Sequence, residues 1–153
     1  MKSAHEWFAL YGTSHRNPVN KAIHWVCIPV IAVTTLGLLE ALPHPFGESG
    51  VHWGVLAGAA SLLFYARMSW SLGLGMALAV GLGLLLNAKI GAAGLPIGPV
   101  SGALFVVAWI AQFVGHKIEG KKPSFFQDLQ FLLVGPAWLL QFVYGRLGLP
   151  ITA

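Results

Sequence analysis

The sequence predicts an all-α membrane protein: a polytopic bundle of about four to five transmembrane helices, preceded by a short amphipathic helix. Of its 153 residues, 56% are hydrophobic and only 9% are charged, whereas a soluble domain carries about 25% charged residues on its wetted surface. The apolar residues also form five long runs, and about 20 apolar residues suffice for a helix to cross a bilayer. We therefore expect a single integral membrane domain over residues 1–153.

The expected helices follow from apolar runs and the turn signals between them. Residues 3–12 gather Trp7 and Phe8 on one side of a short helix, which suits the membrane interface. Asn17 and Pro18 then signal a turn and a helix start. The transmembrane helices are expected at residues 18–42, 51–66, 69–86, 99–116 and 125–144.

Proline and glycine modify three of these segments. Pro29 is expected to kink the first transmembrane helix, and glycines in the third allow close packing. Residues 87–98 are rich in Gly and Pro and are expected to form a connection. The pair Gly135–Pro136 leaves the last segment open between a kinked crossing and a re-entrant hairpin.

The distribution of Lys and Arg predicts the orientation. With five crossings and a cytoplasmic N-terminus, the far side of the membrane holds only Lys89 and Arg146 of the nine basic residues. The other seven fall on the cytoplasmic side, as the positive-inside rule requires: Lys2, Arg16, Lys21, Arg67, Lys117, Lys121 and Lys122. The start of the first transmembrane helix and the end of the fourth are then expected at the same cytoplasmic face.

Charge and cysteine content exclude two classes of site. Although the net charge is +4, the basic residues are scattered singly apart from Lys121–Lys122, so we expect no nucleic-acid partner. They suit topology and lipid headgroups instead. The single cysteine, Cys27, allows neither an intramolecular disulfide nor a thiolate zinc site.

Several histidines are expected near the cytoplasmic face. His15 precedes the first transmembrane helix and His24 lies early in it, with a turn between them, while His116 and Glu119 lie three residues apart at the end of the fourth. Ionisable residues at a membrane edge are costly and are retained mostly for function. Three imidazoles and a carboxylate would suit iron, zinc or manganese, and open positions would suit Fe(II) oxygen chemistry.

Spacing alone leaves other interpretations open. His15 could be an interfacial histidine, and His24 could donate a hydrogen bond to a neighbouring helix. His116 could interact favourably with the helix dipole, and Glu119 could pair with nearby lysines. His5, on the amphipathic helix, is a further candidate ligand, if it faces the same side.

The remaining candidates have supporting or structural interpretations. Gln112 lies four residues before His116 and could support it by a hydrogen bond. His44 and His52 lie in or beside the first loop, on the opposite face, where we expect them at headgroup level.

Two signatures in the sequence resemble those of the 2-hydroxy fatty acid dioxygenases, a family of small multi-span membrane proteins. The first is residues 11–24 (YGTSHRNPVNKAIH), followed by Pro29. The second is residues 109–116 (WIAQFVGH), followed by Glu119 and by residues 123–126 (PSFF). The resemblance covers nearly the whole chain. It implies Fe(II)-dependent α-oxidation of a long-chain 2-hydroxy fatty acid, with O2 as co-substrate and loss of one carbon.

By position, the resemblance implies His15, His24 and His116 as the catalytic iron ligands, with His5 as a less certain addition. In the fungal members the acid follows the second histidine by one residue more than Glu119 does here. The resemblance therefore leaves Glu119 open between a ligand and a supporting residue.

Two further sets of residues are assigned around these ligands. Asn20, Lys117 and Lys121 are predicted to bind the substrate, whose carboxylate the lysines suit. Asn17 and Gln112 are predicted to support the ligands.

Alternative functions are a small membrane transporter and a metal-binding membrane protein without oxygenase activity. A transporter is disfavoured because the polar residues gather at one face, without internal repeats or a midplane site. The compact chain lacks a C-terminal retrieval motif, which favours a bacterial inner membrane over the endoplasmic reticulum of a eukaryote. The expected partners are the lipid bilayer and the fatty acid, and the sequence leaves a homodimer open.

Overall fold

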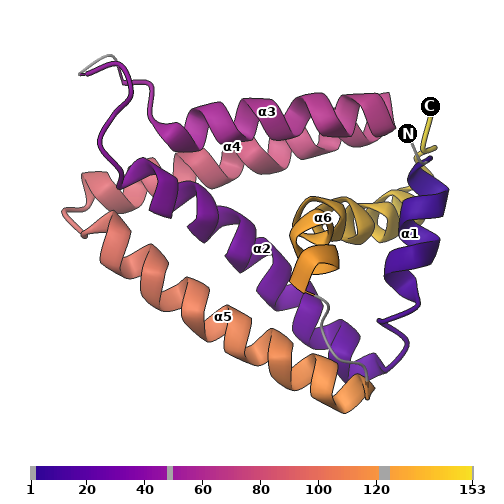
Figure 1. Cartoon of the computed structure of the whole chain (residues 1–153). Coiled ribbons are helices and arrows are strands. Elements are labelled where there is room, and N and C mark those ends of the chain that lie inside the picture. The colour runs from indigo at the N-terminus through magenta and orange to yellow at the C-terminus, as the bar shows by residue number, and fades with distance from the viewer. Residues whose placement is uncertain (1–2, 48–49, 121–124, 153) are drawn as a thin grey trace.

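Six helices make up the part of the chain that the computed structural model describes, residues 3–47, 50–120 and 125–152 (Figure 1). No strand occurs in these ranges. The all-helical class is therefore as predicted. The helices are α1 (Ala4–Gly12), α2 (Pro18–Glu40), α3 (Trp53–Met68), α4 (Trp70–Ala92), α5 (Ile97–Glu119) and α6 (Phe125–Leu147).

Within the described residues, three helices, α2, α4 and α5, are long and apolar enough to cross a membrane, with 23 residues each. At 1.5 Å per residue such a helix is about 35 Å long, which exceeds the roughly 30 Å hydrocarbon core of a bilayer. Helix α3 and residues 131–147 of α6 are apolar but shorter. The membrane fold is confirmed, while crossings by α3 and α6 stay predictions.

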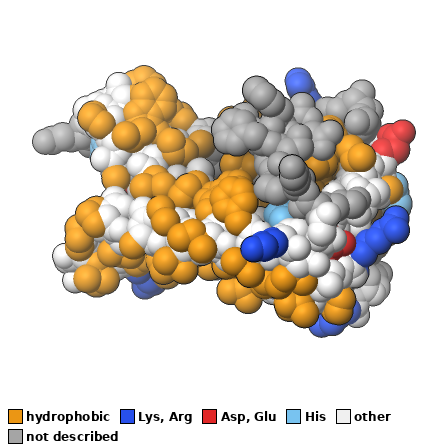
Figure 2. All heavy atoms as spheres, turned by 60° about the horizontal axis from the view of Figure 1, so that its bottom comes forward, with side chains coloured by type: hydrophobic (Ala, Val, Ile, Leu, Met, Phe, Trp, Pro, Cys, Tyr) orange, Lys and Arg blue, Asp and Glu red, His pale blue; other side chains and the backbone are white. Residues whose placement is uncertain are grey.

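The surface of the protein matches this assignment. Leu63, Leu74 and Leu78 are each about two-thirds exposed, while the polar side chains of Asn87 and Ser101 are buried. Figure 2 shows hydrophobic side chains over much of the visible face, with most charged side chains toward one end. A continuous apolar surface of this kind needs a lipid environment.

Helices α2 and α5 form the antiparallel pair that positions the candidate site (Figure 1). Their contact is close at Gly37, where an added Cβ would overlap the hydroxyl of Ser101. Asn87 of α4 donates a hydrogen bond of 3.0 Å to the carbonyl of Val33 and so ties the α3–α4 hairpin to α2. The start of α2 therefore lies beside the end of α5.

Helix α6 lies between α2 and α1 and packs against α1 (Figure 1). The main hydrophobic core forms here, with Phe8 and Tyr11 of α1 against Val134 and Trp138 of α6. Ser3 begins α1 with a capping box to Glu6. Helix α1 is thus anchored on α6, and the chain that follows it is directed back toward α2.

The predicted bounds of the connection at residues 87–98 are wrong, because α4 continues to Ala92 and α5 begins at Ile97. The connection is therefore shorter than predicted. The buried Asn87, bonded to α2, belongs to helix packing rather than to a loop. The turn itself needs only Gly94, with φ +77°, and the Pro96 that precedes α5.

The alternative of a re-entrant hairpin at Gly135–Pro136 is also wrong, because α6 runs unbroken through both residues. An added Cβ at Gly135 would lie 3.1 Å from the hydroxyl oxygen of Tyr11 and 3.2 Å from Cδ1 of Ile28. The glycine therefore permits a close approach to α1 and α2 instead of breaking the helix.

Candidate metal centre

Three histidines from three segments meet where the start of α2 lies beside the end of α5. His15 lies between α1 and α2, His24 is on α2, and His116 is in the last turn of α5. Their ring nitrogens offer one ligand atom each, and these atoms all lie within 4.8 Å of one another. The ring centroids are 4.3 Å apart for His15–His24, 5.0 Å for His24–His116 and 5.4 Å for His15–His116.

Hydrogen bonds fix the orientation of two of these rings. Nδ1 of His15 lies 2.7 Å from the carbonyl oxygen of Tyr11, and Nδ1 of His24 lies 2.9 Å from that of Asn20. A carbonyl can only accept, so Nδ1 carries the proton and Nε2 keeps its lone pair. This is the arrangement that usually orients a metal-bound imidazole.

The two Nε2 atoms are buried and have no hydrogen-bond partner among the described residues. The side chains themselves are almost inaccessible, His24 completely and His15 with 3% of its surface exposed. A buried polar atom without a partner is costly and needs an explanation. A cation between the rings supplies one, so the donor set fits a metal ion.

Burial also sets the charge of His15. It lowers the pKa of the imidazole from 6.5 to about 4, and the neighbouring His116 adds to the effect. At neutral pH the ring is therefore neutral and its lone pair can bind a metal.

Glu119 connects the two parts of the site. Its carboxylate accepts hydrogen bonds from the backbone N–H groups of Arg16 and Asn17 at 2.8 and 2.9 Å and from the side-chain amide of Asn20 at 3.1 Å. These donors surround the start of α2, where the helix dipole favours a negative charge. The structure thus places Glu119 in a supporting position, outside the group of three ligand atoms.

Both asparagines help to position the histidines. Asn17 caps α2 by accepting from the N–H of Val19 at 2.9 Å. Asn20 is fully buried, and its amide donates to the carbonyl of Ser14 at 3.1 Å as well as to Glu119. The amide is therefore engaged within the protein, and its predicted contact with substrate stays a prediction.

Two aromatic side chains that the sequence predicts only for aromatic belts or helix packing, Tyr11 and Trp138, lie against the ring of His15. The Tyr11 ring stacks on it with centroids 4.1 Å apart and 7° between the planes, and Trp138 of α6 approaches to 5.4 Å. The sequence offers two signals for Tyr11: it precedes His15 by four residues, and it begins the first signature. Trp138 gave none, because it lies on a distant segment.

The structure does not bring the other candidates into the ligand group. His5 is exposed on α1, Gln112 is buried on α5, and Lys117 is exposed beside His116. Lys121 lies outside the described residues. At the other end of α2, Nε2 of His52 lies 3.8 Å from a carboxylate oxygen of Glu40, and its ring lies 6.1 Å from that of His44.

A membrane protein with a group of three histidines, two of them buried, at one end of its helices is the class that this fold and site define. The chain belongs to the Mpo1-like family, because the family model described as 2-hydroxy-palmitic acid dioxygenase Mpo1-like matches residues 1–147. This confirms the resemblance seen in the sequence. Comparison with curated proteins and with solved structures found no match.

Replacing Glu119 with glutamine is expected to loosen the contact between α5 and α2. The amide can accept with only one oxygen, whereas the carboxylate accepts with both. We expect a loss of stability of about 1 kcal/mol and, for an iron ion held by the three histidines, roughly 10-fold weaker binding, as when residues that orient metal ligands are lost. Thermal unfolding in detergent and an anaerobic iron titration measure the two effects. Unchanged iron affinity would exclude the supporting role.

Proposed function

We propose that this protein is an Fe(II)-dependent dioxygenase that converts a long-chain 2-hydroxy fatty acid into the fatty acid one carbon shorter. The observation that carries the proposal is the pair of buried Nε2 atoms of His15 and His24, which have no hydrogen-bond partner among the described residues and lie on the two rings that group with His116. The family description supports the substrate class and the use of oxygen.

His15, His24 and His116 would hold the iron. Three nitrogen ligands leave coordination positions open, as in non-haem iron oxygenases. Bound Fe(II) would supply the one-electron chemistry that lets O2 react with a carbon centre. The protein's own contribution is to keep the His15 imidazole neutral between Tyr11 and Trp138 and to hold the rings of His15 and His24 through backbone carbonyls.

The reaction balances with O2 as the only oxidant. The bond between C1 and C2 of the 2-hydroxy acid breaks, and C2 becomes the carboxyl carbon of the shorter acid. C1 leaves as CO2, and the remaining hydrogen and oxygen atoms form water. No additional reductant is required, so the enzyme needs only the acid, O2 and its metal.

Lys117 would attract the substrate carboxylate. It follows His116 directly and is exposed at the end of α5, where a charged head group at the membrane surface can reach it. An ammonium group attracts a carboxylate through charge-assisted hydrogen bonds. The excess of Lys and Arg at this end supports a cytoplasmic position for the centre.

Oxygen uptake by anaerobically iron-loaded protein tests the proposal. With 2-hydroxyhexadecanoate we expect one O2 consumed for each pentadecanoate formed, and with hexadecanoate, which lacks the hydroxyl, no uptake. A chelator should abolish the activity, and Fe(II) but not Zn(II) should restore it, because zinc has no redox chemistry. Iron bound without oxygen uptake would instead identify a metal-binding membrane protein that is not an oxygenase.

A further inference from the structure

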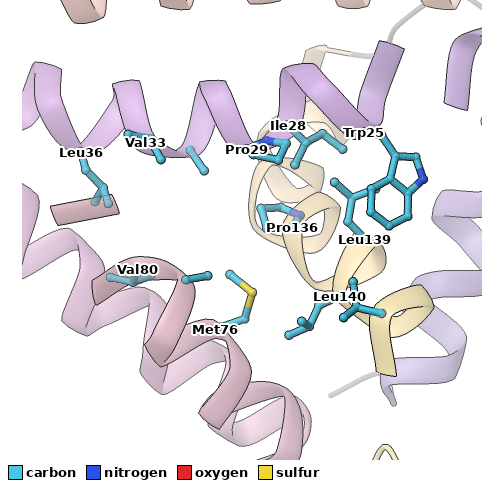
Figure 3. A pocket seen from close by; sticks show the side chains of 13 residues that line it. Trp25, Ile28, Pro29, Val33, Leu36, Met76, Val80, Pro136, Leu139 and Leu140 are labelled. Carbon is cyan, nitrogen blue, oxygen red and sulfur yellow. The ribbon is translucent and has the colours of Figure 1, made fainter. Parts of the chain in front are cut away.

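An apolar cavity of about 270 Å³ lies between α2, α4 and α6 (Figure 3). The 13 residues that line it are all hydrophobic. Such a space has no partner for a charged or polar ligand, so its occupant must be hydrocarbon.

The position of the cavity connects it with the histidines. On α2 its lining begins at Trp25, the residue after His24, includes Ile28 one turn further on, and ends at Leu36. In Figure 3, Leu36 and Val80 lie at the end away from Trp25. Along the axis of α2, one end of the cavity therefore lies at the level of His24, although no histidine is among the residues that line it.

The stretch of α2 that lines the cavity is about as long as one lipid tail. From Trp25 to Leu36 the axis of α2 rises about 16 Å at 1.5 Å per residue. The hydrocarbon core of a bilayer is about 30 Å thick and two tails deep, so one tail covers about 15 Å. A long alkyl chain with its head at the histidines would reach Leu36.

The cavity also opens sideways, since Trp25, Pro29, Ala79 and Val143 all line it and are exposed. Pro29 lacks the backbone N–H that would bond to the carbonyl of Trp25, which locally weakens α2 along this opening. A tail can therefore enter from the surrounding bilayer without passing through water.

We propose that this cavity holds the alkyl tail of the substrate and that its lining sets the preferred chain length. The carboxylate end would lie at the histidines and the tail end beside Leu36 and Val80. The inference rests on the proposed function for the identity of the head group. A membrane phospholipid as the resident occupant is the competing outcome of the tests below.

A matched pair of variants on α4 tests the length preference. Ala79→Phe places a ring into the cavity, whereas Leu78→Phe changes the neighbouring residue, which is 67% exposed and does not line it. For Ala79→Phe we expect kcat/KM to fall about 10-fold or more with 2-hydroxyhexadecanoate, because each displaced methylene contact is worth at least that factor. Turnover of 2-hydroxyoctanoate should stay near the wild-type rate, as should both activities of Leu78→Phe. Equal losses for both acids in Ala79→Phe would overturn the proposal.

A binding experiment separates this inference from the proposed function, because it needs no turnover. Wild-type protein is irradiated with 2-hydroxyhexadecanoate that carries a diazirine near the end of its tail, and the labelled peptides are identified. Labelling at the Leu36 and Val80 end, lost in Ala79→Phe and kept in Leu78→Phe, supports the cavity even if no oxygen is consumed. Labelling of the outer helix surfaces alone, or labelling that phospholipid displaces but unlabelled 2-hydroxyhexadecanoate does not, would overturn it.

Discussion

The His24→Ala variant is expected to lose bound iron and turnover together. The ring is fully buried, its Nδ1 is fixed by the carbonyl of Asn20, and its Nε2 has no other described partner. Alanine removes one of the three proposed ligands, together with the Nδ1 contact that orients it. We expect iron binding to weaken and turnover to fall by more than about 100-fold, beyond the effect of losing a residue that only orients a ligand.

Metal analysis after anaerobic loading and an oxygen electrode measure these losses. His44→Ala is the matched control, because that histidine is exposed and lies near His52 at the other end of α2. It should keep both iron and activity. If His24→Ala retains both as well, the metal assignment fails.

Gly115→Ala is expected to have the second largest effect, on stability and metal binding together. An added Cβ would overlap Oδ1 of Asn20 and lie 3.5 Å from Cδ1 of Ile23. Asn20 cannot turn away easily, because its amide is held by Ser14 and Glu119. Helix α5 must therefore shift, and it carries His116 with it.

We expect Gly115→Ala to reduce the free energy of unfolding by about 1–3 kcal/mol, as overpacking typically does, and to weaken iron binding. The control is Gly81→Ala on α4, where an added Cβ meets nothing within 4 Å. There the higher helix propensity of alanine should raise stability by up to about 1 kcal/mol. Thermal unfolding in one detergent, with and without iron, compares the two, and equal stability of both variants would contradict the close contact.

The fold class could be predicted because it depends on composition and on local signals. The low charge content required a lipid-facing surface, and Asn17 with Pro18 marked the start of α2, where the structure shows a side-chain cap and a proline at the first helical position. The end of α4 could not be predicted in this way. Asn87 looks like a loop residue in sequence, but it is buried and bonds to Val33 on another helix, and α4 continues past it to Ala92.

The grouping of His15, His24 and His116 could be anticipated from topology, because an antiparallel path returns the end of α5 to the start of α2. The role of Glu119 could not be anticipated from the sequence. Its partners are the backbone N–H groups of Arg16 and Asn17, which no side-chain pattern reveals. The carbonyls of Tyr11 and Asn20 that orient the imidazoles could not be predicted for the same reason, because they too belong to the backbone.

The contact of Trp138 with His15 and the contact of Gly115 with Asn20 could not be predicted from the sequence either. Trp138 resembles any interfacial tryptophan, and Gly115 resembles any small residue in a membrane helix. Their roles depend on His15 and Asn20, which lie about a hundred positions away in the chain. Such pairings are set by tertiary packing and not by local propensity.

X-ray absorption at the iron edge of anaerobically loaded protein tests the central claim most directly, because it reports the atoms around the metal. We predict scattering from three imidazole rings, from His15, His24 and His116, with one ring lost in each single alanine variant that retains any metal. Iron surrounded by oxygen atoms alone, without imidazole scattering, would contradict the account.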